Sequence, residues 1–417
     1  MGLISGNGLG LTAILLTAVT YGEKLPTDTD WPQWGGPRRD FRVLGANVAS
    51  TWPQGGPRQL WRRALGEGYS SIAVVGKSLF TMYRKGDEEV VTSVDAVTGK
   101  SLWEYRYGAH IPAGMDMQNG PGPHATPLVL QGRVYSAGAT GKLHCLDARS
   151  GKLLWSHDLV SEYRAALPQY GYSSSPIAYR NTIILPVGAK GAAIMAFDAA
   201  TGVVVWARHD FPISNSSPVL IESGGVRHLV FFLAKQLVGV NPDRGDLLWS
   251  FPHTTQWDLN IATAIWDGNG ILFCSSGYDG GSRAVTLQRT EQQVTAKELW
   301  ANRRLRIHFT NALRIGEYIY GSSGDFGSAF LTAVHLKTGK VAWQTRGFGK
   351  ANLIDAGGKV LLLDEDGVLS LVNLSPQGVT VLAKAPVLHN NAWSIPSLVG
   401  STLYLRDRRD LVALDLR

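Results

Sequence analysis

A nine-residue phrase that returns along the chain constrains the possible folds more than any other feature. The last residues of successive copies are 39 to 52 positions apart. Full copies are DAVTGKSLW (95–103), DARSGKLLW (147–155), DAATGVVVW (198–206), NPDRGDLLW (241–249) and HLKTGKVAW (335–343). Degenerate copies end at Trp300, with Ala296 in the glycine place, and at Leu382, which replaces the tryptophan; Trp61 has the strand but no turn before it. Such a period indicates one structural unit used repeatedly.

Each phrase predicts a β-hairpin. An apolar strand ends at an Asp or Asn, whose side chain accepts from the following amides, and the Gly supplies the positive φ of a tight reversal. The Trp, four residues after the Gly, falls on the outgoing strand, where a large ring fills the wedge between neighbouring sheets. We therefore interpret the phrase tryptophans as structural packing residues: Trp61, Trp103, Trp155, Trp206, Trp249, Trp300 and Trp343.

Two further short strands precede each phrase, as in ATPLVLQGRVYSAGATGKLHCLD (125–147), so each repeat holds four strands. Such units predict an all-β fold, an eight-bladed β-propeller of four-stranded antiparallel blades over residues 58–417. Inner strands are expected to start near Ser71, Thr126, Ser175, Ser217, Thr263, Asn311, Asn352 and Ser394. Because the last unit has only three strands, we predict that the N-terminal strand of Trp61 completes the C-terminal blade and closes the ring.

The segment before the propeller divides in two. The apolar run LGLTAILLTAVT (9–20) has the length of a signal-peptide core, although no Lys or Arg precedes it, so residues 1–22 predict a signal peptide and an exported, periplasmic protein. The run is too short to span a bilayer, and no transmembrane span is expected in the mature chain. Residues 23–57 contain WPQW (31–34), which we interpret as a strap outside the ring that covers apolar blade edge, with a partner-docking peptide as the alternative.

The repeats resemble those of the quinoprotein-like propellers with DxxTGKxxW phrases, a family that includes pyrroloquinoline-quinone (PQQ) dehydrogenases and BamB-like outer-membrane assembly factors. The similarity covers residues from about 58 to 417. The opening DWPQWGGPRRDF (30–41), with GEGYSS, KGDEEVV and GPGPHATPL, resembles exported bacterial PQQ-like repeat proteins. The resemblance implies the fold and says little about activity, because one fold carries many functions.

A quinoprotein dehydrogenase of this family would be expected to show an adjacent cysteine pair and a calcium site with an acidic pair. The only cysteines, Cys145 and Cys274, are 129 positions apart, and they are interpreted as buried side chains. The dense acidic clusters, Asp87 to Glu89 and Asp364 to Asp366, read as solvated turns. No metal site and no cofactor are therefore predicted; PQQ with Ca²⁺ belongs to the alternative function only.

Charge and motifs exclude several other classes. The net charge is +7, but the basic residues are scattered, apart from Arg62 and Arg63, Arg303 to Arg306, and Arg406 to Arg409. Without a basic stripe or a reader motif, nucleic-acid binding is not expected. No nucleophile elbow, HExxH or phosphate loop supports a hydrolase, metalloprotease or nucleotide enzyme.

A ligand or partner site is predicted at the top face, where the loops before the inner strands converge on the central channel. Amides there suit hydrogen bonding, and the rings suit stacking, although turns also favour such residues. His124 and His308 are interpreted as structural rather than catalytic. The predicted rim consists of Glu67, Tyr69, His124, Tyr172, Asn215, Asp258, Asn260, His308, Asn311, Asn352, Asn391 and Trp393.

The leading hypothesis is a non-enzymatic, exported and monomeric propeller that acts as a protein-interaction or assembly scaffold for an envelope protein partner, as the BamB resemblance implies. No catalytic residue is assigned, because no catalytic constellation is visible in the sequence. The alternative is a PQQ-dependent oxidoreductase or cofactor-binding protein with a reduced site at the top face. A third hypothesis is a small-ligand or glycan-binding module.

Overall fold

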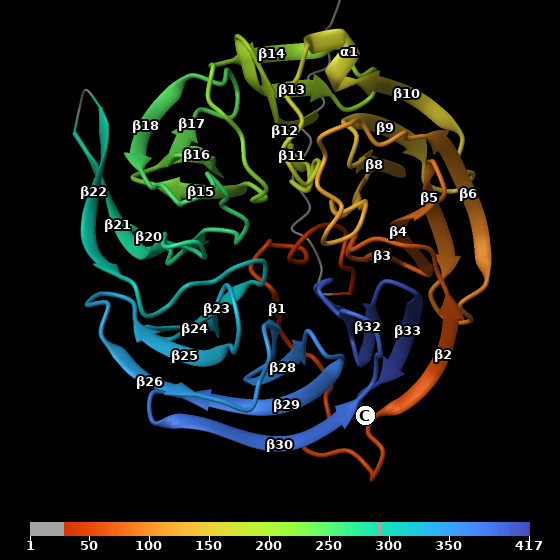
Figure 1. Ribbon diagram of the computed structural model, residues 1–417, viewed down its shortest axis with the longest axis vertical. Coiled ribbons are helices and arrows are strands. Elements are labelled where there is room, and N and C mark those ends of the chain that lie inside the picture. The colour runs from red at the N-terminus through yellow and green to blue at the C-terminus, as the bar shows by residue number, and fades with distance from the viewer. Residues whose placement is uncertain (1–28, 291–292) are drawn as a thin grey trace, which may run out of the picture.

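Eight antiparallel sheets stand around a central axis as the blades of a propeller (Figure 1). The computed structural model describes residues 29–290 and 293–417. The predicted all-β, eight-bladed propeller is confirmed. The predicted signal peptide over residues 1–22 lies outside the described residues. Within the described ranges, no helix is both long enough and apolar enough to span a membrane.

The first four blades follow one another along the chain, each with its innermost strand first. They are β3 (Ala73–Val75), β4 (Ser78–Lys85), β5 (Glu88–Asp95) and β6 (Ser101–Gly108); β7 (Leu128–Leu130), β8 (Arg133–Ala137), β9 (Lys142–Asp147) and β10 (Leu153–Asp158); β11 (Ile177–Tyr179), β12 (Thr182–Ala189), β13 (Ala192–Asp198) and β14 (Val204–Arg208); and β15 (Val219–Ser223), β16 (Val226–Phe232), β17 (Gln236–Val240) and β18 (Leu247–Pro252). The short helix α1 (Leu159–Tyr163) follows β10 and is capped by Asp158.

The other four blades continue the ring. They are β19 (Ile265–Trp266), β20 (Ile271–Ser276), β21 (Gly281–Arg289) and β22 (Val294–Asn302); β23 (Ala312–Ile315), β24 (Tyr318–Ser323), β25 (Phe330–His335) and β26 (Val341–Thr345); β27 (Ala351–Ala356), β28 (Lys359–Asp364), β29 (Val368–Ser375) and β30 (Gly378–Pro386), with β1 (Arg42–Val43); and β31 (Ser397–Val399), β32 (Thr402–Arg406) and β33 (Asp410–Asp415), completed by β2 (Arg58–Ala64).

The ring closes as predicted, between the two ends of the chain. Strand β2 pairs antiparallel with β33, which places Trp61 opposite Ala413. Arg406 of β32 ties this last blade to the first, because its fully buried guanidinium donates to the carbonyl oxygens of Met82 at 2.6 Å and Ser70 at 3.2 Å. The closure gives the last blade its fourth, outermost strand and joins the two ends of the ring.

The phrase tryptophans join neighbouring blades. The indole nitrogen of Trp103 in β6 donates to the carbonyl oxygen of Ala148 in the next blade, at 3.0 Å. Its ring packs against Gly151 of the next turn, where a Cβ would lie 2.6 Å from the ring. Five other phrase tryptophans donate in the same way to the following blade: Trp61, Trp155, Trp206, Trp300 and Trp343.

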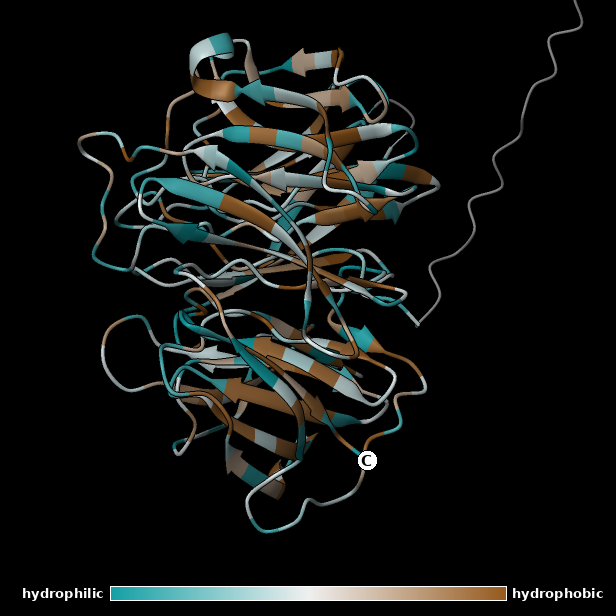
Figure 2. Ribbon diagram, turned by 90° about the vertical axis from the view of Figure 1, so that its right-hand side faces the viewer, coloured by the Kyte–Doolittle hydropathy of each residue, from teal (hydrophilic) through white to brown (hydrophobic). Residues whose placement is uncertain are grey.

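The hydrophobic core consists of wedges between adjacent blades. One wedge contains Tyr135 and Cys145 of the second blade together with Leu185 and Phe197 of the third, all buried. The side view in Figure 2 shows apolar segments along the strands, between the two loop-bearing faces. Because both faces of each sheet contact a neighbour, the second and third strands of a blade are buried along most of their length.

The WPQW segment lies inside the ring, so its predicted place outside the ring was wrong. Trp31 forms a β-bridge with Val74 of the innermost strand β3, and Pro32 accepts from the amide of Val129 in β7. Further on, β1 adds to β27 as a parallel, still more central strand (Figure 1). The edges of the innermost strands carry backbone groups that need partners, and the strap supplies them.

Candidate functional site

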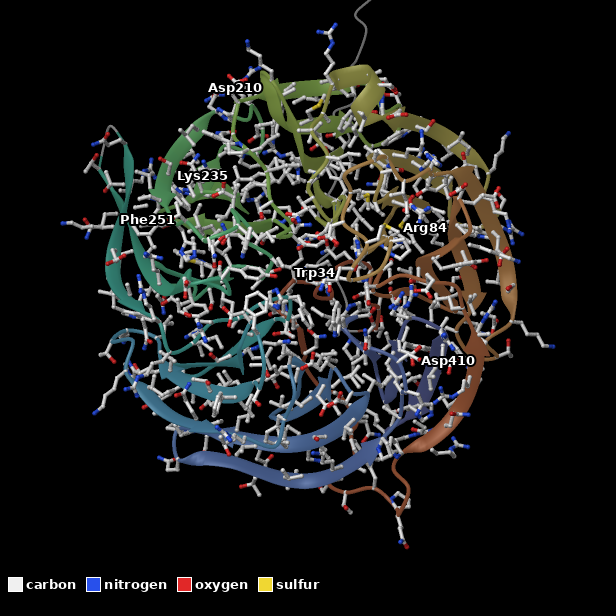
Figure 3. The ribbon with its side chains drawn as sticks, in the orientation of Figure 1. Trp34, Arg84, Asp210, Lys235, Phe251 and Asp410 are labelled. Carbon is white, nitrogen blue, oxygen red and sulfur yellow. The ribbon has the colours of Figure 1, made fainter. Side chains whose placement is uncertain are left out.

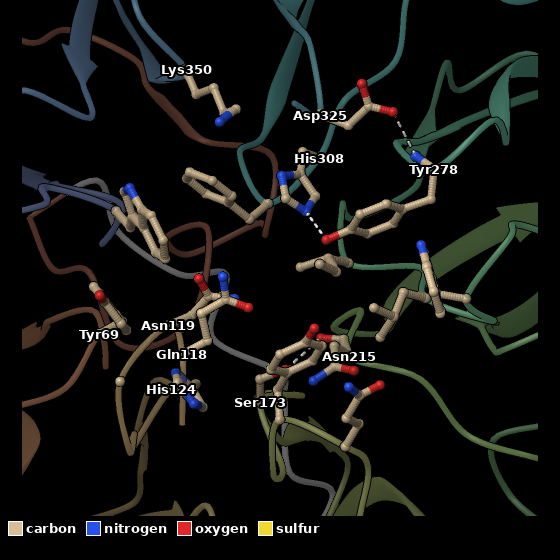
Figure 4. A pocket seen from close by; sticks show the side chains of 18 of the residues that line it. Tyr69, Gln118, Asn119, His124, Ser173, Asn215, Tyr278, His308, Asp325 and Lys350 are labelled. Atoms are coloured by element: carbon tan, nitrogen blue, oxygen red, sulfur yellow. Dashed lines mark hydrogen bonds between the residues drawn. The ribbon is translucent and has the colours of Figure 1, made fainter. Parts of the chain in front are cut away.

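The central channel opens into a pocket of about 550 Å³. Two kinds of loop surround it: those that lead into the innermost strands, and those between the second and third strands of a blade. These loops define the top face; the phrase turns and the C-terminus lie on the opposite face, the right-hand side of Figure 2. Side chains from many blades therefore point into one shared space (Figure 4).

Trp34 of the strap also lines this pocket, and it lies near the centre of the ring in Figure 3. Its indole nitrogen donates to the hydroxyl oxygen of Thr263 at 2.9 Å, and its ring meets Phe41 edge to face. Nearby, the buried guanidinium of Arg39 donates to the carbonyl oxygen of Pro176 at 3.1 Å, and burial lowers its pKa to about 9. The strap thus narrows the channel beneath the top-face loops.

Aromatic rings lie in a row along one side of the pocket. Tyr69 stacks on Trp393 with ring centroids 5.0 Å apart, and on its other side it stacks on His124 at 5.8 Å. Phe309 continues the row beyond Trp393 at 4.6 Å. The four rings come from the loops that lead into four different blades. Such a wall offers an apolar aromatic surface to an incoming group.

The other side of the pocket is polar. His308 Nε2 lies 2.5 Å from the hydroxyl of Tyr278, whose backbone amide donates to Asp325 at 2.9 Å (Figure 4). Burial, and secondarily the positive charge of Lys350, lower the pKa of His308 to about 4. Burial likewise lowers the pKa of His124 to about 4. Both imidazoles are therefore neutral near pH 7 and act as hydrogen-bonding groups there.

Several buried polar atoms around the pocket have no hydrogen-bond partner among the described residues. They include Asn215 Oδ1, His124 Nε2 and His308 Nδ1. An unsatisfied buried polar atom costs free energy, and native structures satisfy such atoms with protein, water or ligand. The pocket therefore combines stacking surface with free hydrogen-bonding capacity, which is the composition of a binding site.

Five of the twelve predicted rim residues line this pocket: Tyr69, His124, Asn215, His308 and Trp393. Three predicted asparagines instead support the channel wall from behind. The side-chain amides of Asn260, Asn311 and Asn352 donate to the carbonyl oxygens of Leu233, Leu353 and Trp393, at 2.7, 2.8 and 3.1 Å. These amides bind backbone across neighbouring loops and strands.

The remaining four predicted rim residues have other surroundings. Tyr172 is buried and donates its hydroxyl to the carbonyl oxygen of Val187. Glu67 forms an ion pair with Arg408 at 2.6 Å, and Asp258 lies 3.5 Å from the ammonium of Lys235. Asn391 is exposed.

Sequence reasoning missed most of the pocket, because only five of its 22 lining residues belong to the predicted rim. Gln118, Asn119 and Tyr170 come from long connections, and Tyr278 comes from a hairpin loop. The signal that was available is loop length: residues 109–127, 159–176 and 253–264 are the longest connections between consecutive blades in the described chain. Long loops on the face where the inner strands begin are able to fold over the channel. The missed lining residues include Gln118, Asn119, Tyr170, Trp257, Tyr278, Phe309, Asp325, Phe326 and Lys350.

The repeated blades and their turn-tryptophan phrase define a PQQ-like β-propeller repeat protein. The family model described as outer membrane protein assembly factor BamB matches residues 86–345, and the chain belongs to this family. The BamB of Yersinia pestis is 26% identical over 283 residues, which cover 64% of this chain and 68% of that protein.

Quinoprotein alcohol dehydrogenase PedH of Pseudomonas putida is 27% identical over 197 residues. That match covers 45% of this chain and only 30% of PedH, so the chain spans less than a third of this relative. Among solved structures, BamB from Moraxella catarrhalis has a TM-score of 0.61 at 17% identity and covers 86% of this chain and 97% of that one. The structural likeness shows the fold.

The pocket residues do not fit a PQQ and calcium site. Asp325 is the one carboxylate among the described lining residues, and it already accepts from the amides of Tyr278 and Phe326. The described chain contains no group of three or more His, Cys, Asp or Glu side chains placed to hold a metal ion. Cys145 and Cys274 are buried within blade strands, where burial raises the pKa of each thiol to about 12. We therefore derive no quinone chemistry for this pocket.

Proposed function

We propose that this chain is a non-enzymatic scaffold of the bacterial envelope that docks a partner protein at the top-face pocket. One observation carries the proposal. Trp257 and Phe326, two large apolar side chains of the pocket lining, are 56% and 74% exposed. Large exposed rings are costly to leave in water, and they are the residue types that dominate protein interfaces.

The pocket beneath these rings suits an anchor side chain of the partner. Its aromatic wall of Tyr69, Trp393 and Phe309 is apolar, and its volume of about 550 Å³ exceeds that of one side chain. Binding hot spots combine a central, desolvated pocket with an exposed rim that excludes water. In this arrangement Trp257 and Phe326 close over the inserted group.

Family membership supports the same role. The matched model and the Yersinia relative carry the name of an outer membrane protein assembly factor, which favours an envelope protein as the partner. Export to the periplasm and a monomeric state are part of this proposal.

Site-specific photo-cross-linking tests the proposal. A photoreactive amino acid is placed at position 257 or 326 of the full chain, expressed in its own host, and compared with one at Val205, which is 52% exposed on the outer strand β14. We expect a discrete cross-linked envelope protein from positions 257 and 326 and none from 205. Equal cross-linking at all three positions, or none at 257 and 326, would contradict top-face docking.

A second candidate, small-ligand binding, is favoured by unpartnered buried atoms of the lining such as Asn215 Oδ1, His124 Nε2 and His308 Nδ1. A cyclic ligand such as a sugar ring stacks on Trp393 and accepts or donates at these atoms. Native mass spectrometry of the chain purified from its own host checks this idea. A bound small molecule that is lost in Trp393→Ala supports it, and a bare chain in both samples counts against it.

A further inference from the structure

A second cavity lies beside the central pocket on the top face, and arginines line it. Its volume is about 240 Å³, and its lining includes Arg303, Arg304, Arg306, Ser328, Phe330 and Gln344. The three arginines belong to the connection between β22 and β23, and Ser328 belongs to the loop between β24 and β25. Asp325 and Phe326 of that second loop line the central pocket, so one loop separates the two cavities.

Hydrogen bonds hold the arginine segment in place. The carbonyl oxygen of Arg304 accepts from the hydroxyl of Ser323 at 2.8 Å and from the side-chain amide of Gln344 at 3.1 Å. The backbone amide of Arg306 donates to the same Ser323 oxygen at 3.0 Å. Gly324 donates its amide to the carbonyl oxygen of Arg306 at 2.9 Å. The cavity is thus built on a backbone that is fixed to strands β24 and β26 of the following blade.

The positive charges around this cavity are only partly balanced. Arg306 lies 3.4 Å from Asp325 and 3.9 Å from Asp279. In the described part of the chain, Arg303 and Arg304 form no ion pair with a carboxylate. A fourth guanidinium, that of Arg346, lies over the ring of Phe330, which lines the cavity. Guanidinium groups that share one cavity repel one another, and a bound anion would offset that repulsion.

We propose that this cavity is an anion site that takes a phosphate group. Guanidinium groups donate in a planar fork that matches oxyanions, and such charge-assisted hydrogen bonds are among the strongest in proteins. A phosphate presents several acceptor oxygens, so it engages more than one guanidinium together with the hydroxyl of Ser328. The site goes beyond partner docking at the central pocket and lies next to it.

Titration calorimetry of the full chain with inorganic phosphate tests the site. The test variant is Arg303→Gln with Arg304→Gln, two exposed residues. The matched control, Arg149→Gln with Lys152→Gln, removes two exposed positive charges from the opposite face. We expect saturable binding to the native chain and to the control, and binding to the test variant weakened about tenfold or more. Arg346→Gln should weaken it by a smaller factor.

Two further arms identify the source of the phosphate. The chain is sedimented with phosphatidylcholine vesicles that contain or lack phosphatidic acid. Sedimentation that requires phosphatidic acid and is lost in the test variant supports a lipid headgroup. Binding of free phosphate without such sedimentation supports a soluble phosphate ester. No phosphate binding in either form, or equal binding by the native chain and the test variant, would overturn the site.

Discussion

Trp249 donates its indole N–H to Nδ1 of His228, 2.9 Å away in the same blade. The other phrase tryptophans donate to the next blade instead. The difference follows from the next repeat, where Ala296 takes the glycine place of the phrase. Ala296 lies within the long strand β22 and pairs with Leu287, so the tight turn that would receive Trp249 is absent at that position. The indole satisfies its N–H within its own blade because the neighbour offers no matching carbonyl.

We predict that His228→Leu lowers the free energy of unfolding by about 1–3 kcal/mol, because it leaves the buried indole N–H of Trp249 without an acceptor. Urea unfolding of a double-mutant cycle with Trp249→Phe isolates this bond. In the Trp249→Phe background, His228→Leu should lower the free energy of unfolding by a smaller amount than in the native chain. Identical costs in the two backgrounds would show that the hydrogen bond contributes nothing.

The phrase glycines carry a second testable contact. Gly99 has a φ of 72°, and a Cβ there would lie 2.8 Å from the ring of Trp61. Gly76 has a φ of 58° with nothing within 4 Å of its Cβ position, so it is the matched control. Both Ala variants carry the backbone cost of about 1–2 kcal/mol, and Gly99→Ala should lose about 1–3 kcal/mol more through overpacking. Thermal unfolding of the pair measures the difference, and equal losses would argue against the contact.

The fold was predictable because one signal is repeated. The number of repeat copies gives the number of blades. The last unit contains only three strands, and β2 supplies the fourth. The strap was placed wrongly because WPQW carries no periodicity. Its position depends on the backbone edges of β3, β7 and β27, which become neighbours only after the ring has closed.

A substitution at Asn260 tests whether this side chain stabilises the channel wall rather than binding a ligand. Its side-chain amide donates to the carbonyl oxygen of Leu233 at 2.7 Å, and the side chain is fully buried. Asn260→Ala should therefore destabilise the chain by about 1–3 kcal/mol, through buried polar groups left unpaired. The exposed Asn181→Ala, in the turn between β11 and β12, should change stability by less than about 0.5 kcal/mol. Chemical denaturation measures the free energy of unfolding of both variants. An Asn260→Ala variant as stable as the native chain would contradict the supporting role.

The site was predictable only in part, because some of its residues are placed by strand direction and others by tertiary packing. Tyr69, His124 and Trp393 immediately precede inner strands, and strand direction alone places them at the channel. Trp257 and Phe326 lie in loops whose path depends on tertiary packing. The sequence also does not separate an amide that faces the pocket, such as Asn215, from one that faces backbone, such as Asn260.

Buried histidines predict the pH dependence of stability. Burial lowers the pKa of His253 to about 3, and its Nδ1 lies 2.9 Å from the Arg283 guanidinium, which requires a neutral ring. The folded pKa lies below the unfolded value near 6.5, so the unfolded state binds more protons and stability falls as the pH drops from about 6.5 toward 3.

Replacing this histidine should flatten that dependence. In His253→Gln, the slope of unfolding free energy against pH between 6 and 4 should decrease by up to about 1.4 kcal/mol per pH unit. The exposed Gln377→Ala, which replaces no titrating group, provides the comparison and should leave the slope unchanged. Unfolding curves at several pH values measure both, and parallel profiles for the native chain and His253→Gln would refute the assignment.

Oxidative footprinting of the top-face rim tests the central claim most directly. Hydroxyl radicals modify exposed rings, and Trp257 and Phe326 are exposed in the isolated chain. The account predicts that both are modified several-fold less in the intact envelope of the host than in the purified chain, while Leu102 on the outer strand β6 reacts equally in both. Equal modification of Trp257 and Phe326 in envelope and purified chain would show that no partner covers the pocket, and would contradict the proposed docking role.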